Sequence, residues 1–263
     1  MTRFLDRYDE RELLGLFEEV GVAETLRGRG FGDFEVAIAE AGLALPHVRY
    51  YATKDGRRHC LLDSCVRRIA VDAERLPDSN IALDRPLDLL LVHWVREEDP
   101  TRAFSVSRPP LPLQEHPGLG ILRRAFRIAV QMARDLGSDG VVNRAKFFHD
   151  ALLFERSRLF LFLDGAEQGR FEALRRDLAS LSLRDATLAI AGSCVRDESG
   201  DVIHWDPGYL VFPLSERLTA HFHSAGYAAA VAKGQRGAHF RVDLEALGQV
   251  CAQLGPSRPA SAQ

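Results

Sequence analysis

Residues 87–95, with the sequence LDLLLVHWV, form the most apolar stretch of the chain and decide the fold. Their apolar side chains do not alternate with polar ones. A run of this kind is typical of a strand that neighbouring elements cover on both faces, as in the middle of a sheet. We therefore predict that residues 87–95 are the central strand of a β-sheet.

The sequence after this strand predicts alternating helices and strands. A proline-rich loop comes first, and residues 121–136 then place apolar side chains at helical spacing with arginines on the opposite face. A short strand at 140–142, a helix at 145–156 and a buried strand at 159–163 follow. This order indicates an α/β or α+β fold in which helices flank a mixed sheet.

Capping and turn signals place most of the remaining elements. Asp9 and Glu12 have the spacing of a capping box, which predicts a helix start, and Lys54-Asp55-Gly56 is a turn signal between two strands. Further predicted elements are strands at 34–38, 47–52, 58–71 and 210–212, a hairpin of 187–195 with 202–205, and helices near 171–178, after Ser215, at 225–233 and after Asp243.

The composition is that of an ordinary globular protein. The 34 Lys and Arg residues nearly balance the 37 Asp and Glu residues, so the net charge of -3 argues against a nucleic-acid partner. The four cysteines form no CxxC pair, which argues against a zinc site or a disulfide scaffold. A charged N-terminus and short apolar runs predict a cytoplasmic protein with no membrane partner.

The start of the helix at 121–136 carries an unusual charge pattern. Arg123, Arg124 and Arg127 lie in its first two turns, and no carboxylate lies within 121–130. Cations near a helix N-terminus are unfavourable by about 0.3–1 kcal/mol each, because the helix dipole already places positive charge there. Gly118 and Gly120 would let backbone N–H groups approach an anion. This pattern predicts a phosphate or pyrophosphate site, and the alternative is a surface helix with solvated arginines.

Residues 87–163 resemble the core of the GCN5-related N-acyltransferases. In that family a central strand leads to an R/Q-x-x-G-x-G/A loop at a helix N-terminus, followed by strand, helix and strand, and the loop here is Glu115-His-Pro-Gly118-Leu-Gly120. Two departures are Glu115, where the family has Arg or Gln, and Phe154, near the position of a tyrosine acid. The resemblance implies acyl-CoA as cosubstrate, held by Gly118, Leu119, Gly120, Ile121, Leu122, Arg123 and Arg124.

Acyl transfer to an amine also requires a base whose pKa lies near neutrality. His93 is one candidate because it lies in the central strand, beside which the acyl group would sit, although a histidine in an apolar strand is also typical of a core. Glu97, Glu98 and His116 are alternatives at the strand exit and in the loop. The sequence does not choose among the four. The acceptor would be a small-molecule or peptide amine.

Two other functions remain open at this point. The histidines and aspartates at 149–150, 204–206, 221–223 and 239 are suitable ligand types for a metal-dependent hydrolase, although no HExxH motif is present. A non-catalytic ligand-binding module built on the same core is the other alternative. We predict an acyltransferase-like domain over 1–164, a C-terminal α/β extension over 165–255 packed on the same core, and a disordered tail over 256–263.

Overall fold

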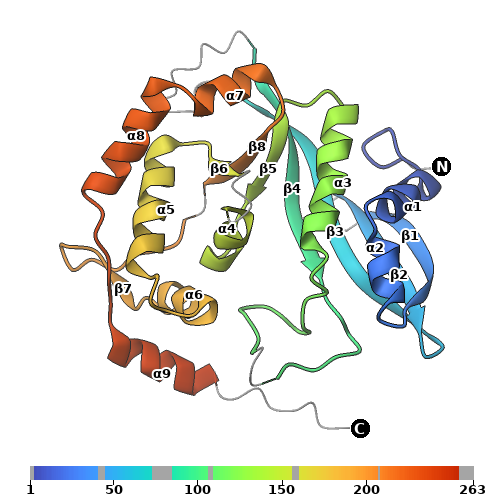
Figure 1. Cartoon of the computed structure of the whole chain (residues 1–263), viewed down its shortest axis with the longest axis horizontal. Helices are drawn as coiled ribbons and strands as arrows, with labels where there is room; N and C mark the ends of the chain where they lie inside the picture. The colour runs from blue at the N-terminus through green and yellow to red at the C-terminus, as the bar shows by residue number, and fades with distance from the viewer. Residues whose placement is uncertain are drawn as a thin grey trace. The chain divides into compact units, whose positions relative to one another are not determined.

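The computed structural model describes residues 3–40, 45–72, 85–105, 109–155, 160–206 and 208–254 (Figure 1). The tail predicted at 256–263 lies outside these ranges. In chain order the elements are α1 (Glu10–Glu19), α2 (Val22–Arg27), β1 (Gly32–Glu40), β2 (Pro46–Lys54), β3 (Arg57–Val71), β4 (Leu87–Glu97), α3 (Leu122–Asp135), β5 (Gly140–Arg144), α4 (Phe148–Glu155), β6 (Leu161–Phe162), α5 (Gly165–Asp177), α6 (Leu183–Ala191), β7 (Val195–Arg196), β8 (Tyr209–Pro213), α7 (Glu216–Phe222), α8 (Ala225–Arg236), β9 (Arg241–Val242) and α9 (Leu244–Leu254).

The fold is a mixed α/β fold, as predicted. Seven strands form one sheet in the order β1-β2-β3-β4-β5-β8-β6, and β7 pairs with β9 in a separate ladder. Two compact units make up the chain. The first contains Met1–Ala70, Asp88–Phe104 and Glu115–Val141, and the second contains Val71–Leu87, Ser105–Gln114 and Val142–Gln263. The division therefore falls inside β5, whereas the sequence placed the boundary at residue 164.

Local sequence signals explain the helix and hairpin at the start of the first unit. The Asp9 carboxylate accepts from the Glu12 N–H at 2.8 Å, and the Glu12 carboxylate accepts from the Asp9 N–H at 2.8 Å, so the predicted capping box begins α1. Asp55 and Gly56 have positive φ angles of 52° and 72°, which suits the tight turn joining β2 to β3.

An aromatic contact packs α1 onto β2 in the first unit. Phe17 stacks on Tyr50 of β2 with ring centroids 4.4 Å apart, and both side chains are buried. The register of β2 and β3 shifts between Tyr50 and Tyr51, which pair with Leu62 and Cys60. This bulge leaves Leu61 without an opposite residue in β2.

Strand β4 is covered on both faces over only half of its length. The side chains of Leu87 and of residues 89–92 are buried, but His93 and Trp94 are exposed. The Asp139 N–H donates to the Asp88 carbonyl at 2.6 Å, which places the start of β5 beside the start of β4. Because β5 has 5 residues and β4 has 11, the end of β4 continues beyond the length of β5.

Helices dominate the second unit. The predicted hairpin of 187–195 with 202–205 is wrong over 187–191, because residues 183–191 form α6, whose N-cap Ser182 accepts from the Asp185 N–H at 3.1 Å. Its inner end is present, since the Ile203 N–H donates to the Val195 carbonyl at 2.9 Å. Only the short pair of β7 and β9 and a bridge between Arg196 and Val202 remain extended there. Helices α5 and α8 run side by side (Figure 1), with backbone contacts at glycines on each helix. Among the described residues, no helix combines the length and apolarity required to cross a membrane.

Candidate functional site

The N-terminus of α3 is capped by a carboxylate from the chain itself. Glu97, the last residue of β4, accepts from the Gly120 N–H at 3.1 Å and from the Ile121 N–H at 3.2 Å. These amides were predicted to hold a pyrophosphate, so for Gly120 and Ile121 the expectation of free donors is wrong. The helix dipole favours a negative charge at this place, and Glu97 provides that charge from 23 residues earlier in the chain.

The rest of the glycine loop is arranged around the Glu97 side chain. A Cβ on Gly118 would lie 3.3 Å from Glu97 Oε1, so the glycine makes room for this carboxylate. Leu119 and Ile121 have no exposed surface, and Leu122 is half-buried. Burial raises the pKa of Glu97, although hydrogen bonds from Ile121, Gly120 and Leu119 act in the opposite direction.

The arginines at the start of α3 remain accessible. Arg123, Arg124 and Arg127 are exposed, and none of them forms an ion pair or hydrogen bond within the part of the chain that the structure describes. Exposed arginines are expected both for the predicted anion site and for its alternative of solvated surface arginines, and two of the predicted backbone donors are occupied. His93 also lies on the surface, with its ring 5.3 Å from that of Trp94, so it is not the core histidine that its apolar strand suggested.

Two of the four predicted bases meet in one pocket of the first unit. This cavity of about 290 Å³, which we call the β3–β4 pocket, is lined by residues from the start of β3, the end of β4 and the following loop. Glu98 and His116 line it, whereas His93 and Glu97 do not. Cys60 and Asp63 of β3 also contribute, and sequence reasoning missed both because they precede Glu98 by more than thirty residues.

Glu98 is the acidic group of this pocket that lacks a cationic partner among the described residues. Its Oε1 accepts from the Glu115 N–H at 3.1 Å, which fixes the orientation of the carboxylate. The other acids and arginines of the lining are paired: Arg58 with Glu35 at 2.9 Å, Arg96 with Glu115 at 3.7 Å, and Asp63 with both Arg49 and His47 at 3.1 Å. The pocket therefore presents one uncompensated carboxylate with His116 nearby.

Cys60 is poorly suited to act as a nucleophile in the same pocket. Its thiol donates to the Leu62 carbonyl, with the sulfur 3.5 Å from the oxygen. Desolvation raises the pKa of this thiol above its usual value, and the reactive species is the thiolate. Proton transfer by Glu98 or His116 is the chemistry that the lining supports better.

The histidines of the second unit do not form a metal centre within the described residues. His149 Nε2 lies 3.2 Å from Asp150 Oδ1, and burial lowers the pKa of this histidine. His221 Nε2 lies 2.9 Å from the Leu163 carbonyl oxygen. No group of three or more His, Cys, Asp or Glu side chains with metal-binding geometry occurs in these parts of the chain, so the hydrolase alternative has no ligand set here.

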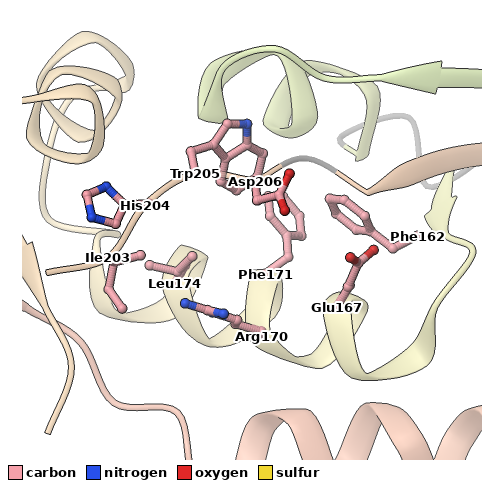
Figure 2. Close-up of a pocket in the computed structure, with 9 residues that line it drawn as sticks. All are labelled: Phe162, Glu167, Arg170, Phe171, Leu174, Ile203, His204, Trp205 and Asp206. Carbon is pink, nitrogen blue, oxygen red and sulfur yellow. The ribbon is translucent and has the colours of Figure 1, made fainter. Parts of the chain in front are cut away.

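A second pocket lies entirely within the second unit (Figure 2). It has a volume of about 150 Å³, and we call it the α5 pocket because four of its lining residues come from that helix. Glu167 of α5 has a pKa raised to about 6, first by desolvation and then by the negative charges of Asp164 and Asp206. Sequence reasoning predicted this helix only near 171–178, so it did not place Glu167 and Arg170 on one helical face with Phe171 and Leu174, although their spacing allows it.

Glu167 is expected to titrate with a midpoint of about 6 when its side-chain carboxyl carbon is followed by NMR. An Asp206→Asn variant should move this midpoint toward the ordinary glutamate value, because it removes a like charge. Glu198→Gln, in an exposed turn of the same unit, is the control and should leave the midpoint unchanged. A wild-type midpoint at the ordinary glutamate value would show that the carboxylate is solvated normally.

No family model matches this chain, and a search of curated proteins finds no significant match.

Proposed function

We propose that this chain is an N-acyltransferase that transfers an acyl group from an acyl-CoA to a small-molecule or peptide amine. The β3–β4 pocket carries the proposal, because it places Glu98 and His116 together at the exit of β4. The order of β4, glycine loop, α3, β5, α4 and β6 supports it, since the resemblance to the N-acyltransferases implies this order.

Glu98 is placed to act as the general base for an incoming amine. Its carboxylate is uncompensated, so it attracts the ammonium form and then accepts a proton, which leaves a neutral amine as the nucleophile. The hydrogen bond from the Glu115 N–H holds one oxygen, and the other oxygen remains available to the amine. His116, half-buried in the same pocket, is the second group that can exchange protons there.

The donor site fits an acyl-CoA only in part. The exposed arginines at 123, 124 and 127 fit a polyphosphate, because they have no ionic partners within the described residues. The Gly120 and Ile121 amides do not fit a pyrophosphate while Glu97 occupies them. An acyl-CoA supplies the acyl group as a thioester, and its phosphates can reach these amides only when the Glu97 side chain leaves.

Glu97→Ala is expected to tighten CoA binding about 30-fold, because it frees two amides whose hydrogen bonds contribute about 1 kcal/mol each. The same change should lower the free energy of unfolding by about 1–2 kcal/mol, because the helix loses its cap. Calorimetry with CoA, acetyl-CoA and a longer acyl-CoA measures the first effect, and urea denaturation measures the second.

Two controls separate this effect from a general change in charge. Glu115→Gln removes a carboxylate from the same loop without freeing either amide, so it should change CoA affinity much less. Arg123→Gln with Arg124→Gln in the Glu97→Ala background should abolish the gain. If neither the wild type nor Glu97→Ala binds any of the three ligands, the chain is not a CoA-dependent acyltransferase. Binding without transfer to any amine would instead identify a ligand-binding module.

A further inference from the structure

One face of α5 supplies two oppositely charged side chains to the α5 pocket. Glu167, Arg170, Phe171 and Leu174 follow the i, i+3, i+4, i+7 spacing of a helical face, and all four line this cavity. Figure 2 shows the Glu167 carboxylate and the Arg170 guanidinium as separate groups of the lining. No ion pair forms between them, which means that their charged atoms are more than 4 Å apart.

Both charges are unpaired within the part of the chain that the structure describes. The Glu167 carboxylate and the Arg170 guanidinium have no hydrogen bond or ion pair there. The other acid of the lining, Asp206, is paired with Arg144 at 3.7 Å. Besides the exposed imidazole of His204, the pocket therefore offers one negative and one positive group that are unpaired among the described residues, and a ligand with a single charge would satisfy only one of these two.

The α5 pocket is small and partly aromatic. Trp205 is held in place by its indole N–H, which donates to the Ala145 carbonyl at 2.9 Å. Phe171 lies against it with ring centroids 6.4 Å apart, and Phe162 lies 5.2 Å from Phe171. A cavity of about 150 Å³ admits a molecule of about the size of benzene. The occupant must therefore be small, with an apolar part that suits these rings.

Gly208 fixes the position of the acidic group. A Cβ at this residue would lie 1.7 Å from Glu167 Oε2, so the carboxylate rests directly against the Gly208 backbone. This contact explains how Glu167 can be exposed over much of its surface while its charged end is desolvated. Any side chain at 208 would push the carboxylate out of its present position.

We propose that the α5 pocket binds a small zwitterion of the α-amino acid class, with its ammonium group at Glu167 and its carboxylate at Arg170. The aromatic wall of Trp205 and Phe171 packs against the apolar part of the ligand. This site lies within the second unit and makes no use of the β3–β4 pocket. The proposal therefore does not depend on whether the chain catalyses acyl transfer.

The test is calorimetry of the full chain with glycine, L-alanine and L-valine, together with isobutylamine and isobutyrate, which each carry only one of the two charges. At least one amino acid is expected to bind about tenfold more tightly than either singly charged compound. Glu167→Gln and Arg170→Gln should each weaken that binding about 10- to 100-fold, because each removes a charge-assisted hydrogen bond. Glu198→Gln is the control and should bind like the wild type.

Gly208→Ala provides a variant that keeps every charge. It should weaken amino-acid binding by displacing the Glu167 carboxylate, and the melting temperature shows whether the fold survives. Wild-type binding should strengthen from pH 5 to pH 7 as Glu167 loses its proton. Asp164 and Asp206 oppose this ionisation, Arg144 and Arg170 favour it, and the imidazole of His204 is a further titratable group of the lining. The proposal is overturned if no amino acid binds, or if isobutylamine or isobutyrate binds as tightly as the amino acids. It is also overturned if Glu167→Gln has no effect on amino-acid binding.

Discussion

Replacing Glu98 by glutamine is expected to lower kcat for acyl transfer by about two to four orders of magnitude, the usual contribution of a positioned acid or base. Glutamine has the shape of glutamate and can still accept the hydrogen bond that the Glu115 N–H donates at 3.1 Å. It cannot take a proton from an amine. The variant should therefore keep its stability and its affinity for CoA, and lose turnover.

Steady-state kinetics with a detected amine acceptor measures this effect, and His93→Gln is the matched comparison. His93 is exposed and lies outside the β3–β4 pocket, so this change should leave kcat within about twofold of the wild type. His116→Gln, tested beside it, shows whether the second group of the pocket also exchanges protons. Loss of turnover in His93→Gln together with full activity in Glu98→Gln would identify His93 of β4 as the base and contradict our assignment.

Replacing Gly169 by alanine is expected to lower the free energy of unfolding of the second unit by about 3 kcal/mol or more. A Cβ there would lie 2.1 Å from the Val231 carbonyl oxygen and 2.9 Å from the Gln235 N. Both atoms belong to the backbone of α8, which runs beside α5 (Figure 1), so neither can rotate away as a side chain would. The helices must move apart, and strain of this kind typically costs 1–3 kcal/mol or more.

The chain offers both a matched control and a local reporter for this measurement. Gly248 lies inside α9 with no atom within 4 Å of a Cβ placed on it, so Gly248→Ala should stabilise the protein by about 0.5–1 kcal/mol. The two tryptophans lie in different units, and a Trp94→Phe background leaves Trp205 to report on the second unit during urea denaturation. Equal unfolding free energies for Gly169→Ala and the wild type would disprove the close contact.

Elements whose signals are local could be predicted from the sequence. The capping residues Asp9, Ser215 and Asp243 each bond an N–H three residues ahead, and each begins a helix as expected. The turn at Asp55-Gly56 also occurs where its residues predict it. The failures were α6, part of which was predicted as a strand of a hairpin, and the end of β4, where His93 and Trp94 are exposed although the strand was predicted to be covered on both faces.

The candidate sites could be predicted only in part, because they combine residues that are far apart in the sequence. Arg123 and Arg124 at the start of α3 are accessible, as their positions on the helix predict. The residue that occupies the amides there is Glu97, which the sequence suggested only as a base. The partners of Glu98 in the β3–β4 pocket and the free charges of the α5 pocket depend on which segments meet in space.

By itself, the sequence determined the α/β class, most of the helix and turn positions, and the accessibility of the arginines at the start of α3. These features depend on interactions between residues a few positions apart, which a linear pattern records. The tertiary structure alone decided that Glu97 neutralises the helix start, that Glu98 remains without a cation among the described residues, and that Glu167 and Arg170 face one cavity unpaired. Whether a charge is compensated depends on which groups lie near it in the folded chain. Those groups can be far away in the sequence, because electrostatic and packing interactions depend on distance in space and not on separation along the chain.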